Sequence, residues 1–214
     1  MDKNQKYVIT INRELGSGGR TVGRKLAEKL NVAFYDKLLI NELKKKFELD
    51  TEQIEKVKSG KSDWWREFIN AATYMGQGMN ELWYYQRMTG EEGTLVTSRD
   101  MFKVVKEILQ NVAEEGSCII AGRSGFSVFA EHPNHLSIFI QAPMEHRIQR
   151  IMSKQNLSHE EAEKVIKKVD DMRESYVKKY AGVSRYDTRN YDLVINMEGK
   201  TEDEVVELIL KFIG

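Results

Sequence analysis

This chain of 214 residues has a single cysteine, two prolines and no net charge at neutral pH. The lone Cys118 excludes an internal disulfide framework and a paired-cysteine site. No stretch approaches 18 uncharged apolar residues, so we expect no membrane span. The first six residues lack the apolar segment of a secretory signal, so we expect a cytoplasmic protein. The balance of 33 basic and 33 acidic residues argues against a protein that coats nucleic acid.

The positive charge is nevertheless concentrated in two blocks. Residues 3–29 contain seven basic and two acidic side chains, and residues 164–189 contain eight and four. From Thr201 onward, one basic side chain stands against four acidic ones. These blocks are either two solvated helix faces or two sides of one anion-binding site that the fold brings together.

Five short apolar segments alternate with helical patterns along most of the chain. The apolar segments are 7–11, 32–35, 117–121, 136–140 and 193–195. The helical patterns are 21–30, 38–47, 101–115, 144–154, 159–180 and 202–212. Such alternation predicts a three-layer α/β domain with a five-stranded, mainly parallel sheet.

Residues 50–99 interrupt this alternation. They contain no convincing strand and are rich in aromatic and methionine side chains, such as Trp64, Trp83 and Met88. We expect a helical insertion here, with residues 1–49 and 100–214 forming the core. Its large side chains would form a helical core, a base-stacking pocket or the interface of a homodimer.

A glycine-rich loop joins the first expected strand to the first expected helix. Gly16, Gly18 and Gly19 allow tight turns, and the following helix supplies free N–H groups and the positive end of its dipole. Nearby arginines, Arg13 and Arg20 among them, add charge. The loop is therefore a candidate phosphate cradle. The alternative is a tight turn that binds nothing.

Two phosphate-binding motifs fit the position of this loop, and neither matches strictly. A dinucleotide fingerprint would use Gly16, Gly18 and the later Asp36, but Thr21 stands where its third glycine should be. In a P-loop, Gly18 would be the last glycine and Gly19 would replace the lysine. The three residues between the strand end and the glycines favour the longer P-loop.

Four segments together resemble the cytidylate kinase-like family, which is related to nucleoside monophosphate kinases. They are Ile-Asn-Arg-Glu-Leu-Gly-Ser-Gly-Gly-Arg (11–20), Phe-Tyr-Asp-Lys (34–37), Ile-Ala-Gly-Arg-Ser (120–124) and Gln-Ala-Pro-Met-Glu-His-Arg (141–147). The match covers nearly the whole chain in order. The resemblance implies a P-loop kinase core, an acceptor-binding insertion and a mobile lid at about 147–185. It also implies ATP and Mg²⁺ as cofactors and CMP or dCMP as acceptor.

The resemblance also implies roles for individual residues. ATP phosphates would lie on Gly16, Ser17, Gly18, Gly19, Arg20 and Thr21. Within that loop, Arg20 would take the role of the lysine, and Thr21 would bind Mg²⁺. Asp36 would orient the acceptor or the metal. The remaining assigned residues are Arg13, Arg123, Arg147 and Asp170 for the acceptor, and Arg150 and Arg173 for the transferred phosphoryl group. Arginine suits such work because its planar fork binds phosphate oxygens in pairs.

Several of these residues have plainer interpretations. Asp36 would also cap a helix that starts at residue 38. Asp170 and Arg173 are three apart and would also form an ordinary surface ion pair. Arg147 and Arg150 would also lie on a solvated helix face.

Other functions fit the same sequence. The replaced lysine favours a non-catalytic module, a homodimer that senses a nucleotide or anion. A dinucleotide-binding oxidoreductase is a third hypothesis. All three bind a small phosphate-containing ligand, and none requires nucleic acid or a membrane.

Overall fold

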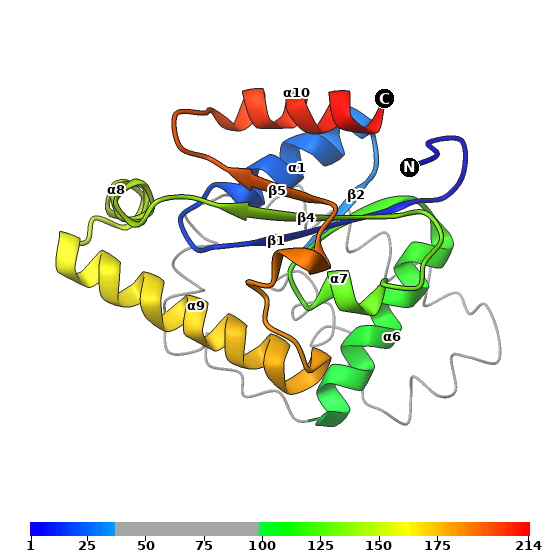
Figure 1. The fold of residues 1–214 in the computed structure, drawn as a ribbon, viewed down its shortest axis with the longest axis horizontal. Helices are drawn as coiled ribbons and strands as arrows, with labels where there is room; N and C mark the ends of the chain where they lie inside the picture. Colours follow the sequence, from blue (N-terminus) through cyan, green and yellow to red (C-terminus); the bar gives the residue numbers. More distant parts are fainter. Residues whose placement is uncertain (37–98) are drawn as a thin grey trace.

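The structure is a computed structural model that describes residues 1–36 and 99–214 of the chain. Its centre is a five-stranded sheet in the order β2-β3-β1-β4-β5 (Figure 1). The strands are β1 (Val8–Arg13), β2 (Ala33–Asp36), β3 (Cys118–Ala121), β4 (His135–Gln141) and β5 (Leu193–Asn196). Every neighbouring pair is parallel. The expected α/β class and five-stranded sheet are confirmed.

Helices cover both faces of the sheet (Figure 1). One face carries α1 (Gly19–Leu30) and α10 (Glu202–Ile213), which pack against each other. The other face carries α6 (Arg99–Glu115), α7 (Gly125–Val128), α8 (Met144–Gln155) and α9 (His159–Ala181). This is the expected three-layer arrangement.

The core follows from the alternation of side chains along the strands. In β1, Ile9 and Ile11 join the apolar cluster beneath α1 and α10, whereas Val8 joins the cluster on the other face. Because successive strand residues point to opposite faces, a strand buried on both faces is apolar nearly throughout. All six residues of β1 are buried, as expected for the central strand.

The helix N-termini differ in how they are capped. Ser158 and Glu161 form a capping box at α9, and Thr201 and Glu204 form one at α10. In α1 the capping position is Gly18, which provides no side-chain hydrogen bond, and the first turn has no acidic residue. The N-terminus of α1 therefore keeps its attraction for an anion.

Two sequence-based expectations fall outside the described residues: the helix at 38–47 and the helical insertion at 50–99. Within 1–36 and 99–214, the boundaries of the expected elements differ by up to two residues, and α1 begins at Gly19 rather than at Thr21. The sequence did not predict α7 or the short 3-10 helix Thr188–Asn190. No helix in these two ranges is long and apolar enough to cross a membrane.

Candidate functional site

The residues singled out by sequence gather where the parallel strands end. Arg13 is the last residue of β1, Asp36 is the last residue of β2, and Arg123 follows β3 by two positions. The chain leaves β1 toward α1 on one face and leaves β3 toward α7 on the other. Ligands of open α/β sheets bind at such switch points, beyond the carboxyl ends of the strands.

The glycine loop requires its glycines for two physical reasons. Gly16 and Gly18 both have a φ of 82°, a backbone conformation that residues with side chains rarely adopt. A Cβ atom on Gly16 would lie 2.8 Å from the carbonyl oxygen of Arg147, and one on Gly19 would lie 2.7 Å from the Cβ of Arg13. Ser17 steadies the turn by donating from its hydroxyl to the Glu14 carbonyl at 2.9 Å.

Arg20 and Asp36 form a buried ion pair next to this loop. The Arg20 Nε donates to Asp36 Oδ2 at 2.7 Å. Asp36 is 2% exposed and Arg20 is 8% exposed. The sequence predicts separate roles for these two residues, whereas the structure shows that they contact each other. Their roles toward ATP, acceptor or metal stay predictions.

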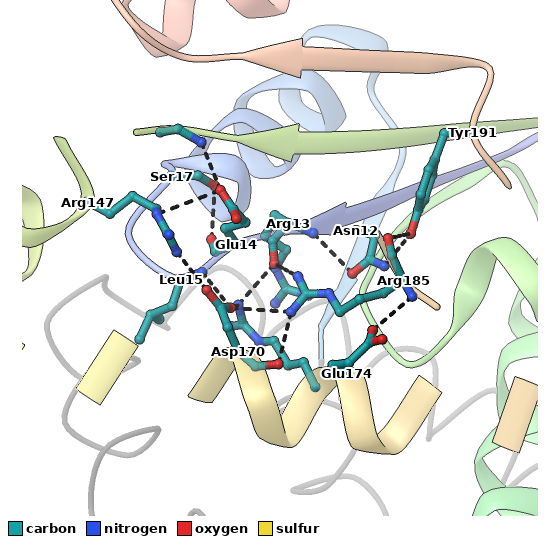
Figure 2. A network of polar contacts seen from close by, with 12 residues as sticks. Asn12, Arg13, Glu14, Leu15, Ser17, Arg147, Asp170, Glu174, Arg185 and Tyr191 are labelled. Atoms are coloured by element: carbon teal, nitrogen blue, oxygen red, sulfur yellow. Dashed lines mark hydrogen bonds and ion pairs between the residues drawn. The ribbon is translucent and has the colours of Figure 1, made fainter. Parts of the chain in front are cut away.

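Asp170 of α9 connects the helical layer to the glycine loop (Figure 2). Its Oδ2 accepts from Arg147 Nη1 at 2.7 Å. Its Oδ1 accepts from the backbone N–H of Leu15 at 3.0 Å and from Arg173 and Arg185, each at 3.3 Å. Asp170 is only 6% exposed, so the interpretation of Asp170 and Arg173 as an ordinary surface ion pair is wrong.

Arg147 extends the same cluster through Glu14. Its Nε lies 3.6 Å from Glu14 Oε2, an oxygen that also accepts from the backbone N–H of Ala142 at 3.0 Å. Arg147 is buried, so its interpretation as part of a solvated helix face is also wrong. The cluster therefore fixes the start of α8 against the glycine loop.

Arg150 lies beside the first turn of α1. Its Nη1 is 2.6 Å from Glu202 Oε1, and its Nη2 donates to the Thr21 hydroxyl at 3.2 Å. Glu202 also lies close to Gly18, where an added Cβ would be 3.3 Å from its Oε1. A cation and a carboxylate thus face the open N-terminus of α1.

Arg13 and Arg123 both lie near the end of β3. The Arg13 guanidinium passes so close to Gly122 that a Cβ there would overlap its Nη1. Arg123 and Ser124 both have positive φ, at 57° and 53°. Such conformations in residues with side chains are frequent at functional sites. Burial lowers the pKa of Arg123, and Tyr176, whose ring centre is 6.0 Å from the guanidinium, opposes that shift.

The two basic blocks of the sequence meet in this site. Arg173, from the second block, donates to the carbonyl of Arg13, from the first, at 3.0 Å. Arg185 donates to the same carbonyl. These residues join the blocks, whereas the lysines Lys164, Lys167 and Lys178 are exposed on the helix face as the alternative expected. Binding of an anion between the blocks stays a prediction.

Sequence reasoning missed three participants: Glu14, Arg185 and Glu202. Glu14 lies inside the glycine-loop segment, and Arg185 lies inside the second basic block. Neither stands at a helical spacing from its partners, so no periodicity could have identified it. Glu202 is the first residue of α10, and its approach to Arg150 depends entirely on how the layers pack.

Comparison with known proteins agrees with this architecture. The profile of the cytidylate kinase-like family matches residues 8–199. A cytidylate kinase of Sulfolobus acidocaldarius is 31% identical over 116 residues, which cover 54% of this chain and 59% of that protein. A cytidylate kinase of Methanopyrus kandleri is 30% identical over 108 residues, covering 47% and 56%. The chain thus spans about six tenths of the length of these curated relatives.

Solved structures give the same fold. An uncharacterized protein from Eubacterium ventriosum superposes with a TM-score of 0.70 and 25% identity, over 98% of both chains. The shikimate kinase of Bacteroides thetaiotaomicron has a TM-score of 0.50 and 14% identity, over 97% of this chain and 98% of its own. These similarities confirm the P-loop kinase-type fold.

Proposed function

The chain belongs to the cytidylate kinase-like family, and on that premise we propose that it is an ATP-dependent phosphotransferase. It transfers the γ-phosphoryl group of ATP to a nucleoside monophosphate, CMP or dCMP, or to a related small acceptor. One observation carries the proposal: a glycine loop at a helix N-terminus whose capping residue is Gly18 lies beside arginines from α8, α9 and the segment after α9, namely the buried Arg147 and Arg185 and the partly buried Arg173.

The donor phosphates would bind on residues 16–21. The positive φ of Gly16 and Gly18, and the absence of an acidic residue from the first turn of α1, support this assignment. Arg150, which already contacts Thr21, would neutralise a phosphate there. Arg20 would add charge in the place of the missing lysine.

The acceptor would bind at the ends of β1, β2 and β3, near Arg13, Asp36 and Arg123. Phosphoryl transfer needs little covalent chemistry from the protein, so catalysis consists mostly of positioning groups and neutralising charge. Arg173 on α9 would turn from Asp170 toward the moving phosphoryl group. The carboxylates that hold the arginines keep them oriented until the nucleotides bind.

The residues present fit a magnesium ion held mainly by phosphate oxygens. Mg²⁺ usually takes only one or two protein ligands in such sites and keeps several waters. Thr21 would provide a hydroxyl and Asp36 a carboxylate. Across 1–36 and 99–214, no group of three or more His, Cys, Asp or Glu side chains could hold a metal by itself. Bound Mg²⁺ would neutralise charge on the phosphates.

A non-catalytic sensing role remains the second candidate because of Gly19. A Cβ at this position would lie 2.7 Å from the Cβ of Arg13, so the backbone has no room for the lysine of a standard P-loop. A homodimer and a cytoplasmic location are predicted for either function. The family match does not support the third hypothesis, a dinucleotide-binding oxidoreductase.

Two measurements test the proposal. Calorimetric titration with ATP and Mg²⁺ gives nucleotide binding, and ADP formation is assayed with CMP, dCMP, other nucleoside monophosphates and small hydroxyl compounds. We expect ATP binding and ADP formation that depends on CMP or dCMP. ATP binding without turnover on any acceptor would contradict the kinase and leave the sensing module.

A further inference from the structure

Arg173 and Arg185 donate to the same two acceptors. Arg173 Nη1 donates to the Arg13 carbonyl at 3.0 Å and to Asp170 Oδ1 at 3.3 Å. Arg185 donates to the Arg13 carbonyl through Nη2 and to Asp170 Oδ1 through Nη1 at 3.3 Å. Figure 2 shows Arg185 between these two acceptors. Two cations thus lie side by side, and their charges repel each other.

Arg185 is closely packed in the core. Its side chain is 0% exposed, and its guanidinium lies 5.8 Å from the ring of Phe139 and 5.0 Å from the ring of Tyr186. Its backbone N–H donates to Glu174 at 3.0 Å, and its carbonyl accepts from the Tyr191 hydroxyl at 2.8 Å. Any large movement of this side chain would break a closely packed part of the core.

The Tyr191 hydroxyl links Arg185 back to β1. It accepts from Asn12 Nδ2 at 2.6 Å, and the Asn12 side-chain oxygen accepts from the backbone N–H of Arg13 at 3.1 Å. The segment that carries Arg185 is therefore joined to the end of β1 at two points. Arg173 differs, because its side chain is 17% exposed and it lies on α9.

We propose that Arg185 is a positioning residue that keeps the Arg13 carbonyl and Asp170 supplied with donors when Arg173 turns toward the transferred phosphoryl group. This inference rests on the proposed phosphotransferase function. A buried carbonyl or carboxylate that loses its donor destabilises the protein. Because Arg185 remains, and Arg147 and the Leu15 N–H still reach Asp170, the departure of Arg173 leaves neither acceptor without a donor.

The repulsion between Arg173 and Arg185 also favours the movement of Arg173 toward the phosphoryl group. Burial lowers the pKa of Arg185, and the charge of Arg173 lowers it further, while Asp170 opposes both. The arginine stays charged, so moving Arg173 away removes an unfavourable contact. Loss of Arg185 would instead leave Arg173 as the main donor to the Arg13 carbonyl and hold it away from the substrate.

A double-mutant cycle on the full chain tests this role. We compare Arg185→Gln, Arg173→Ala and the double variant by kcat and by KM for ATP, at matched folded protein. Arg185→Gln should lower kcat about tenfold, the scale of a coupled pair, and change KM for ATP less than about twofold. In the Arg173→Ala background the same change should lower kcat no further, because no Arg173 is left to release.

Two further variants separate this role from a general loss of structure. Arg189→Gln is the matched control, since this arginine lies four residues away, is 89% exposed and pairs with Asp187. It should leave kcat unchanged. Arg185→Lys keeps the charge but has one donor group, and it should restore part of kcat. If Arg185→Gln does not fold, the cycle is run with Arg185→Lys.

Equal losses of kcat in both backgrounds, or no loss at all, would overturn the role of Arg185 while leaving the phosphotransferase intact. A wild-type chain that turns over no acceptor would overturn the proposed function first, before any variant is made. The two failures are therefore distinguishable.

Discussion

Arg20, in the first turn of α1, and Asp36, the last residue of β2, form an ion pair of 2.7 Å that is almost completely buried. They are 16 residues apart, and their contact joins the helix of the glycine loop to an outer strand of the described sheet. A buried ion pair adds little over an apolar pair, but removing one partner leaves the other with less compensation for its buried charge.

Single substitutions in this pair should therefore destabilise the fold. We expect Arg20→Met or Asp36→Leu to lower the free energy of unfolding by about 3–5 kcal/mol, and the double variant to lose much less. Urea unfolding of the three variants measures this coupling. Losses that simply add would show that the pair is not coupled.

Arg20 should also contribute to ATP affinity if it replaces the lysine. Because one charge contact is lost, Arg20→Ala should weaken ATP binding by about tenfold or more, measured by calorimetry on folded protein. Unchanged ATP affinity in Arg20→Ala would refute the role proposed for Arg20 in ATP binding.

Gly16→Ala should abolish ATP binding, because φ is 82° there and the new Cβ would lie 2.8 Å from the Arg147 carbonyl. Gly116→Ala is the matched control, since a Cβ at that position meets nothing within 4 Å. Calorimetric titration with ATP and Mg²⁺ compares the two variants. Full affinity in Gly16→Ala would rule out this loop as the phosphate cradle.

Glu202→Gln should raise the affinity for ATP. The Glu202 carboxylate lies near Gly18 and holds Arg150 at 2.6 Å, so it repels an incoming phosphate and competes for the arginine. We expect affinity to rise about threefold to tenfold in low salt and less in high salt, because salt screens part of the effect. Asp203→Asn, which affects only a surface pair with Lys25, is the control and should show no rise. Weaker binding in Glu202→Gln would indicate that the carboxylate orients Arg150 for ATP.

His135 should make the fold sensitive to mild acid. Burial lowers its pKa from 6.5 to about 4, and its ring makes a 2.7 Å hydrogen bond with Thr10 Oγ1. In the folded state, the His135 ring therefore stays neutral between pH 6.5 and pH 4. In the unfolded state, the same ring takes up a proton over this range. Stability should fall over that range as pH decreases, by up to about 3 kcal/mol.

Urea unfolding at pH 7.5 and pH 4.5 measures this loss. His135→Asn should remove most of the His135 contribution to the difference, whereas His159→Asn, at a half-exposed position, should preserve it. An identical pH dependence in wild type and His135→Asn would contradict the assignment.

The secondary structure and the fold class followed from local patterns. Apolar segments of three to five residues correspond to strands of four to seven residues, and apolar periodicity located α6, α8, α9 and α10 to within two residues. The start of α1 was placed too late because Gly19 and Arg20 carry no apolar signal. That helix begins where Gly18 turns the backbone, at a φ of 82°.

The sequence predicted which residues form the site but not which of them contact each other. The sequence by itself identified the glycine loop, Asp36 and most of the arginines, because these residues lie in recognisable motifs or at helical spacings. It could not pair Arg20 with Asp36, nor bring Arg173 and Arg185 to one carbonyl of β1. Those contacts join residues 16 to 172 positions apart, and local spacing carries no information about such distances. Only the packing of α1, α8 and α9 around the strand ends decided which charges meet, because burial leaves each guanidinium few acceptors within reach.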